Sequence, residues 1–423
     1  MTDKESGRKR TDKPWLQSIS AIQHDRTAIV IGAGMAGAAT ARSLAERGWQ
    51  VTVLDKHPQP AREASGNPQG MLYTRLSPNP TPLTQLVIQG YRHTLNLLQQ
   101  APEEIYQLCG LVQLPDSEKE KIRQQKLVDC GRYQALMEGM TAAQLTAKAG
   151  ITVEQDGLFF PDGGWLKPPA FVGWLLEHDN IRFQGDSEVK TLHKVNDSWQ
   201  LTMADNRTLS TTVVVIACGH HTSTLAQTKH LPLKAIRGQV TVVPATEQSM
   251  ALRTVVCEDG YIAPASNGKH TLGATFHFDD PDQSCRASDH QLNLDNIANF
   301  APALAEMLNF SDLDTNKLEG KTGYRCTTPD YLPMVGPLMD ADLFRERFAA
   351  LARNAKTRVE EEIPWLDGLY INTGHGSRGL ITAPLSGDIV ASQICGAPAP
   401  IPAELSAELH PGRFLARELI RGR

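Results

Sequence analysis

The chain has 423 residues, of which 41% are hydrophobic and 21% charged, and its formal net charge is −5. This length and composition predict a globular protein of two domains, and the net charge gives no global sign of nucleic-acid binding. The seven cysteines never occur in C-x-x-C spacing. Their scatter argues against a disulfide framework or a zinc site and favours a reducing compartment.

The start of the chain is charged and lacks the apolar run of a signal peptide. The sequence also has no apolar stretch long enough to cross a membrane. We therefore expect a flexible lead-in over residues 1–25, no membrane partner and a cytoplasmic location.

The most informative motif follows this lead-in. An apolar strand over residues 28–31 leads into Gly32, Gly34 and Gly37 at G-x-G-x-x-G spacing, and a small-residue helix over 38–47 comes next. Gly32 permits a tight turn, Gly34 lets a pyrophosphate approach the backbone, and Gly37 lets helix and sheet pack closely. The helix N-terminus offers N–H groups and a positive dipole end to phosphates.

A second strand over residues 51–55 ends in Asp55, where a carboxylate can accept hydrogen bonds from an adenosine ribose. Strand, glycine turn, helix, second strand and acid in this order predict a dinucleotide site, whereas a glycine triplet alone marks only a tight turn.

The rest of the chain alternates between segments with mainly helical patterns and segments rich in expected strands. Residues 82–150 are mainly helical, with a short strand near 111–114. Further on we expect strands at 157–160, 181–184, 188–195, 199–203 and 212–217, and a helix from Pro168-Pro169 through 177. After residue 231 the expected elements are strands at 238–243, 260–263 and 270–275, a helix over 289–307, a strand at 368–372 and a helix over 383–393.

These elements predict an α/β fold with an α+β insert: a discontinuous Rossmann-like FAD-binding domain and a mainly antiparallel β substrate domain. The FAD-binding domain is expected over residues 26–81, 157–230 and 365–400. The substrate domain is expected over residues 82–156 and 231–364, followed by a basic C-terminal tail or helix over 401–423.

The late glycine turn favours FAD over NAD. Gly374-His-Gly376-Ser-Arg-Gly379-Leu leads into a helix whose backbone N–H groups can stabilise charge on a reduced flavin. A nicotinamide enzyme has no need of such a turn hundreds of residues after the first. Cofactor contacts are expected from residues that lie in or beside these turns: Gly32, Gly34, Met35, Ala36, Gly37, Asp55, Lys56, Ser65, Gly66, Asn67, Gly70, Met71, Gly219, Gly376, Ser377, Arg378, Gly379 and Leu380.

Over residues 26–400 the order of motifs resembles the D-amino-acid-oxidase-like flavoenzymes, such as glycine and sarcosine oxidases. It looks more closely like the FAD-dependent oxidoreductase domain of the MnmC family, which modifies the tRNA wobble uridine. The stretches that carry the resemblance are ASGNPQGMLY at 64–73, PDGGWL at 161–166, GYRCTTPDYLPMVG at 323–336 and GSRGL at 376–380.

The resemblance implies that the carboxymethylaminomethyl group of a tRNA wobble uridine, 2-thiolated or not, is oxidised to the aminomethyl group with release of glyoxylate. In bifunctional members this domain follows a methyltransferase domain. A methyltransferase domain or protein is therefore an expected partner, and the chain is either a free-standing oxidoreductase or part of a longer protein. The rival functions are an oxidase or dehydrogenase of a free small amine such as glycine, sarcosine or a D-amino acid, and a non-catalytic flavin-binding scaffold.

Two residues take catalytic roles under this resemblance. Arg325 matches the arginine that grips the substrate carboxylate, and a planar guanidinium can hold a carboxylate at two points. The alternative for Arg325 is a structural ion pair with Asp330. Tyr261 matches an active-site tyrosine and could close the carboxylate pocket, although an ordinary core tyrosine fits as well.

Other polar residues near the turns receive structural interpretations. His375 is interpreted as a structural hydrogen-bonder, and Arg378 could face flavin, tRNA phosphate or solvent. The His220-His221 pair has no carboxylate or cysteine at ligand spacing, so we expect no metal. Cys326 gives no reason to expect a covalent flavin link.

Basic stretches at 345–358 and 413–423 could contact tRNA phosphates or form solvated faces.

Overall fold

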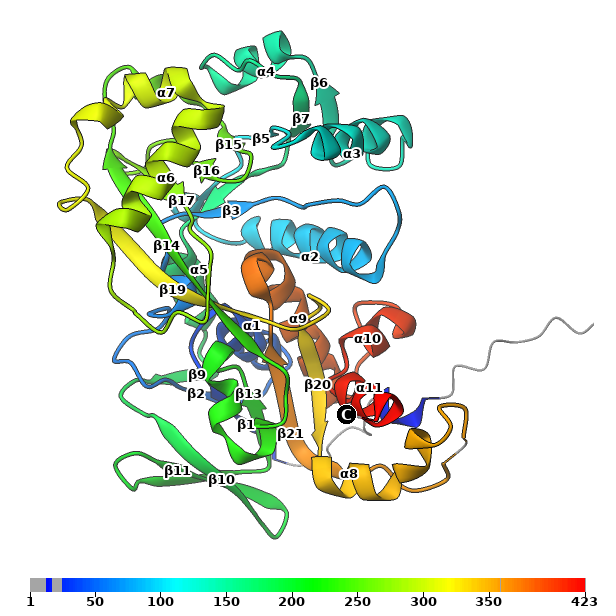
Figure 1. Ribbon diagram of the computed structural model, residues 1–423. Coiled ribbons are helices and arrows are strands. Elements are labelled where there is room, and N and C mark those ends of the chain that lie inside the picture. Colours follow the sequence, from blue (N-terminus) through cyan, green and yellow to red (C-terminus); the bar gives the residue numbers. More distant parts are fainter. Residues whose placement is uncertain (1–12, 17–24, 358, 423) are drawn as a thin grey trace, which may run out of the picture.

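The computed structural model describes residues 13–16, 25–357 and 359–422 of the chain. Within these residues two large sheets organise the fold, with helices between and around them (Figure 1). The expected lead-in over 1–25 lies mostly outside the described residues. Its described part differs from the expectation, because a 3₁₀ turn at Pro14–Leu16 places Trp15 against the rings of Phe344 and Phe348.

The first sheet has six strands in the order β20-β21-β13-β1-β2-β9. All neighbours pair in parallel except β20, which runs antiparallel to β21. The strand bounds are β1 Thr27–Ile31, β2 Gln50–Leu54, β9 Ile181–Gln184, β13 Val213–Ile216, β20 Met334–Met339 and β21 Trp365–Thr373. Distant parts of the chain thus build one Rossmann-like sheet, as the apolar strand runs predicted.

Continuous apolar strands form here because both faces of this sheet are covered. Side chains alternate between faces along a strand. Val30 and Val215 pack with helix residues such as Leu44 and Ile389, whereas Ile31 and Ile216 pack with Leu192, Trp199 and Leu201 of a small antiparallel sheet. That small sheet consists of β10 Val189–Val195, β11 Ser198–Met203 and β12 Thr208–Thr211.

The helical layer on the first sheet includes α1 Met35–Ala45, α2 Pro82–Leu98, α5 Pro168–Leu176 and α9 Gly379–Cys395. Gly387 of α9 lies so close to α1 that an added Cβ would come within 2.7 Å of the backbone at Ala39. Pro384 lies inside α9 and has no N–H for the carbonyl of Leu380, and the hydroxyl of Thr94 on α2 donates to that oxygen instead at 3.0 Å. With this substitute donor α9 begins at Gly379, whereas the sequence analysis expected the helix to begin at residue 383.

The second sheet has nine strands, and its main path is β18-β14-β17-β16-β15-β5-β7-β6, with β19 paired to β14. Neighbours are antiparallel except β5 and β15. The bounds are β5 Leu111–Gln113, β6 Glu138–Met140, β7 Gly157–Phe160, β14 Lys234–Pro244, β15 Val255–Cys257, β16 Tyr261–Ile262, β17 Lys269–Gly273, β18 His277–Phe278 and β19 Glu319–Thr327. The mainly antiparallel sheet that we expected after residue 231 is therefore present.

Helices and a short sheet complete this half of the molecule. Helices α6 Ala287–Phe300 and α7 Pro302–Met307 lie on one face of the second sheet (Figure 1). Their apolar residues join the core beneath it. Pro302 starts α7 and divides the single helix expected over 289–307. The remaining elements here are α3 Glu118–Asp129, α4 Ala142–Ala149, and a three-stranded sheet of β3 Gly70–Leu72, β8 Gly164–Leu166 and β4 Tyr106–Gln107.

Two strands lie in a different sheet from the one that the expected domain ranges gave them. β7 was assigned to the FAD-binding domain but pairs with β5 and β6 in the second sheet. β20 was assigned to the substrate domain but forms the edge of the first sheet beside β21. Likewise α2, expected in the substrate domain, packs on α9. Apolar strands carry no local sign of which sheet they join, because strand partners are distant in sequence.

The end of the chain folds back on the first sheet. Helices α8 Ala341–Arg347, α10 Ala403–Leu409 and α11 Gly412–Arg421 lie in this region. The expected basic tail is thus two short helices, and Leu405 and Leu409 of α10 join the apolar core beneath β20 and β21.

Candidate active site

A cavity of about 590 Å³ extends from the turn between β1 and α1 to strand β19. Its volume lies within the range of cofactor and ligand sites. Most residues predicted to contact the cofactor or substrate line it: Gly32, Gly34, Met35, Ala36, Asp55, Lys56, Ser65, Asn67, Gly70, Met71, Gly219, Tyr261, Arg325, Gly376, Ser377, Arg378, Gly379 and Leu380. Gly37 and Gly66 do not line it and support the turns from behind.

The first glycine turn is built by close backbone contacts. Gly32 has φ +106°, a conformation that an L side chain rarely adopts. A Cβ at Gly37 would overlap the carbonyl oxygen of Gly32, so only glycine lets α1 start this close to β1. The N–H of Met35 donates to Ser65 Oγ at 3.0 Å, which ties the segment after β2 to the start of α1.

Asp55 braces this turn. Its Oδ2 accepts the N–H of Ala33 at 2.7 Å and its Oδ1 accepts the N–H of His57 at 2.9 Å. The acid predicted to bind a ribose therefore also fixes the backbone on which phosphates would rest. Both roles are compatible, because each carboxylate oxygen has more than one lone pair.

A charged cluster lies at the same end of the cavity. Lys56 Nζ is 2.7 Å from both Glu63 Oε1 and His221 Nε2, and His57 Nε2 is 2.8 Å from the same Glu63 oxygen. The hydrogen bond with His221 is the main factor that lowers the pKa of Glu63, burial raises it, and Lys56 and His57 lower it further. Burial and the charge of His221 lower the pKa of His220 to about 4.

The fold thus brings the carboxylate of Glu63 next to the His220-His221 pair, a proximity that sequence spacing did not reveal. Atoms of Glu63, His220 and His221 that could ligate a metal lie within 4.8 Å of one another. The ammonium of Lys56 already contacts two of the three groups. We accordingly interpret the cluster as an ion-pair network at the cavity wall.

The second glycine turn brings β21 to α9. His375 Nδ1 lies 2.9 Å from Thr382 Oγ1 and its Nε2 lies 3.0 Å from Asn372 Oδ1, so both ring nitrogens have protein partners. Burial lowers the pKa of His375 to about 3. These contacts agree with the structural interpretation of this histidine. Arg378 is half-buried at the cavity wall, and burial lowers the pKa of its guanidinium.

Arg325 and Tyr261 lie across two glycines on the second sheet. The Arg325 guanidinium covers Gly238, and the Tyr261 ring covers Gly273. Arg325 Nη1 donates to the carbonyl of Thr275 at 3.0 Å, and its Cζ lies 4.8 Å from the centroid of the Phe276 ring. Burial raises the pKa of Tyr261 to about 12, against the effect of the Arg325 charge, so the phenol keeps its proton.

The alternative role for Arg325 is wrong. Asp330 is paired with Arg413 and Arg417 of α11, and among the residues that the structure describes no carboxylate pairs with Arg325. Burial lowers the pKa of the Arg325 guanidinium without removing its charge at neutral pH. An unpaired, half-buried cation facing a cavity can pair with an anion that enters it.

Some of the arginines in the two basic stretches that could have contacted tRNA phosphates are held in ion pairs within the protein. Arg413 is buried on Asp330, and Arg345 pairs with Asp342 and Glu418. Arg358 lies outside the described residues.

Sequence reasoning missed several residues in or next to the cavity. Thr275 and Phe276 hold Arg325, and Tyr324 lines the cavity next to the His220 ring, with 4.9 Å between ring centroids. The two phenylalanines in the otherwise polar stretch 275–280 were the available signal.

The cavity fits a dinucleotide flavin. The buried hydroxyl of Tyr324 has no hydrogen-bond partner among the described residues, and a Cβ at Gly219 would meet open space. The Tyr324 hydroxyl offers a polar group, and the space at Gly219 leaves room, for a molecule bound between the two glycine turns. Cys326 is buried, which raises the pKa of its thiol to about 11.

Comparisons with known proteins point the same way. The sequence profile of the family described as FAD dependent oxidoreductase (DAO) matches residues 27–393. The chain is 46% identical over 411 residues to the tRNA 5-methylaminomethyl-2-thiouridine biosynthesis bifunctional protein MnmC of Pseudomonas entomophila, covering 97% of this chain and 63% of that protein. For the protein of the same description from Chromobacterium violaceum the identity is 46% over 413 residues, covering 96% and 62%.

Among solved structures, glycine oxidase from Bacillus cereus matches with a TM-score of 0.69 and 22% identity, covering 88% of this chain and 95% of that one. L-proline dehydrogenase from P. horikoshii matches with a TM-score of 0.70 and 18% identity, covering 92% and 97%. At these identities the structures show the fold. The chain spans about 63% of the length of the curated relatives it matches.

Proposed function

Because this chain belongs to the DAO family of FAD-dependent oxidoreductases, we propose that it oxidises the 5-carboxymethylaminomethyl group of a tRNA wobble uridine to the aminomethyl group. Its relatives at about 45% identity are described as tRNA 5-methylaminomethyl-2-thiouridine biosynthesis proteins. The group to be oxidised is a glycine attached to the nucleoside through its nitrogen.

The unpaired guanidinium of Arg325 is the observation that carries this proposal. It faces the cavity on the side of the second sheet, held by Thr275 and Phe276. A glycyl carboxylate can pair with its remaining N–H groups at two points. Such a pair fixes the neighbouring carbon and nitrogen and so orients them for reaction before the chemical step.

The cofactor and the protein divide the chemistry. Bound FAD would supply the hydride acceptor for oxidation of the glycyl C–N bond to an imine, which water would hydrolyse to glyoxylate and the aminomethyl product. Tyr261, protonated through the working pH range, can donate to the same carboxylate. Gly34 and Ser65 at the first glycine turn, and Gly376 and Gly379 at the second, are the residues that would hold the two halves of FAD.

This reaction needs a deprotonated amine and no obligatory side-chain base. His375 is committed to Asn372 and Thr382, so we assign it no proton transfer. We propose that the reaction takes place in the cytoplasm and that a methyltransferase, as a domain or a separate protein, acts on the aminomethyl product.

The test is an assay with purified, FAD-loaded protein. tRNA that carries 5-carboxymethylaminomethyluridine, with or without 2-thiolation, should be converted to the aminomethyl form, detected by nucleoside mass spectrometry, with one glyoxylate released per conversion. Oxidation of free glycine or sarcosine without any change in that tRNA would instead support the rival function.

A further inference from the structure

Two exposed phenylalanines lie beside Arg325, which lines the cavity. Phe276 is 51% exposed and Phe278 is 62% exposed, and their ring centroids are 5.7 Å apart in an edge-to-face arrangement. Among the described residues, Tyr331 is the other exposed large aromatic. Exposed aromatic pairs of this kind cost solubility, so their place beside a binding cavity points to a ligand.

Strand register places this pair next to Arg325. Ile236 of β14 pairs with Phe278 on one side and with Arg325 on the other. Residues directly opposite one another in a sheet point to the same face. Phe278 and Arg325 therefore share one face of the second sheet, and the Phe276 ring lies directly against the Arg325 guanidinium.

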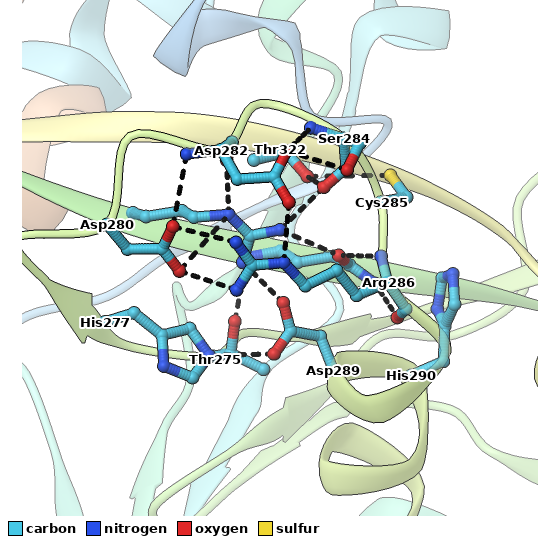
Figure 2. Close-up of polar contacts among 12 residues, drawn as sticks. Thr275, His277, Asp280, Asp282, Ser284, Cys285, Arg286, Asp289, His290 and Thr322 are labelled. Atoms are coloured by element: carbon cyan, nitrogen blue, oxygen red, sulfur yellow. Dashed lines mark hydrogen bonds and ion pairs between the residues drawn. The ribbon is translucent and has the colours of Figure 1, made fainter.

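The segment that carries the two rings is held by a buried network (Figure 2). On the opposite face of the sheet, Arg237 is fully buried and donates to Asp289, to the carbonyl of Asp282 at 2.6 Å and to the carbonyl of Ser284 at 2.6 Å. His277, which stands between the two phenylalanines in the chain, lies 2.7 Å from the other oxygen of Asp289.

Arg286 completes the network. It donates to Asp280 at 2.6 and 2.8 Å and to Asp282 at 2.8 Å, which closes the loop after β18 on itself (Figure 2). These contacts fix the backbone on either side of Phe278, so the exposed rings are presented in a set position and lose little freedom when they bind a partner.

The length of the proposed substrate brings its base to this pair. With the glycyl carboxylate on Arg325, four bonds separate the carboxylate carbon from the uracil ring. At about 1.5 Å per bond the ring lies about 5 Å away. Phe276 already lies at a comparable distance from the guanidinium. Phe278 is the next exposed ring, 5.7 Å from Phe276, and is available to a nucleotide next to the modified one.

We propose that Phe276 and Phe278 form a stacking surface for the unpaired bases of the tRNA anticodon loop, with Phe278 taking a base next to the wobble position. This inference rests on the proposed function and extends it to the recognition of RNA beyond the modified group. Unpaired RNA bases are commonly bound by stacking on aromatic side chains. The cationic side chain of Arg378 at the cavity wall suits a phosphate of the same loop.

The experiment compares two substrates in FAD-loaded protein: an anticodon stem-loop RNA with 5-carboxymethylaminomethyluridine at the wobble position, and the same modified nucleoside alone. The measured quantity is the ratio of kcat/KM for the RNA to kcat/KM for the nucleoside. Phe278→Ala should lower this ratio about five- to a hundred-fold, the range expected for loss of one base stack. Phe278→Trp should restore it, and Phe278→Leu should not.

The control is Met250→Ala, which removes a 59% exposed apolar side chain beyond the far end of β14 and should leave the ratio at the wild-type value. A wild-type ratio in Phe278→Ala, or full restoration by Phe278→Leu, would overturn the stacking surface and point to an apolar protein contact. Wild-type protein that oxidises sarcosine but neither modified substrate would overturn the proposed function, and the stacking surface with it.

Discussion

Arg413 and Asp330 form a two-point ion pair, in which Nε and Nη2 of the arginine each donate to one carboxylate oxygen at 3.0 Å. Arg413 is 4% exposed, and Arg417 adds a further contact of 2.5 Å to the same carboxylate. Asp330 follows Arg325 by only five residues in the chain, yet it is committed to α11. The guanidinium of Arg325 is consequently available to the cavity.

The first prediction concerns Arg325. Arg325→Ala should lower kcat/KM for the modified tRNA about 30-fold to several thousand-fold, because it removes one partner of a desolvated charge pair. Arg325→Lys should recover part of the loss, since an ammonium keeps the charge but not the two-point geometry. FAD content, measured from the flavin absorbance, should stay at the wild-type level in both variants. Loss of flavin would assign Arg325 to cofactor binding instead.

The second prediction concerns Asp330 and pH. Burial raises the pKa of Asp330, but the hydrogen bonds and charges of Arg413 and Arg417 outweigh it and lower the pKa to about 2. The pair should therefore stabilise the fold fully above the ordinary aspartate pKa of 3.8, and this stability should be lost as pH falls from there through about 2.

Arg413→Ala should lower the free energy of unfolding by about 2–3 kcal/mol at pH 7, because Asp330 keeps only Arg417. The difference from wild type, measured by denaturant unfolding, should shrink as pH falls below 4. A difference that stays constant with pH would show that the arginine acts through packing alone.

The third prediction concerns Asp55. Asp55→Ala leaves the N–H groups of Ala33 and His57 without their acceptor and loosens the first glycine turn. FAD affinity, measured by fluorescence titration of the apoprotein, should fall about 5- to 150-fold. Asp55→Asn should lose less, since one amide oxygen remains. Glu46→Ala, at the exposed end of α1, is the matched control. Unchanged affinity in Asp55→Ala would remove Asp55 from the cofactor site.

The fourth prediction concerns His375. Its pKa is about 3 in the fold because it is buried, against an ordinary value of 6.5. The unfolded chain takes up a proton on this histidine below 6.5 while the folded chain does not. The histidine should therefore reduce stability progressively as pH falls from 6.5 to about 3.

His375→Ala should lower the free energy of unfolding by about 2–3 kcal/mol at pH 7, because it removes both ring hydrogen bonds. It should also show a weaker loss of stability between pH 6.5 and 4 than wild type. An activity profile of the wild-type enzyme that titrates with His375, followed by NMR of the ring, would contradict its structural assignment.

Local chemistry made much of this site predictable. Gly32, Gly34 and Gly37 occur within six residues, and a backbone that must turn tightly and admit a phosphate leaves few alternatives to glycine. The same holds for Gly374 and Gly376 before α9. Such constraints act over a few neighbouring residues, so their pattern is visible in one dimension.

Pairings between distant segments were not predictable in the same way. Glu63 meets His221 across 158 positions, β20 joins β21 instead of the second sheet, and Phe276 packs on Arg325 from the connection between β17 and β18. By itself the sequence determined the dinucleotide-binding turns and the alternation of α/β and antiparallel segments. Only the tertiary structure decided which acid would pair with which arginine, because ion pairs form between whichever side chains the packed sheets and helices bring within reach.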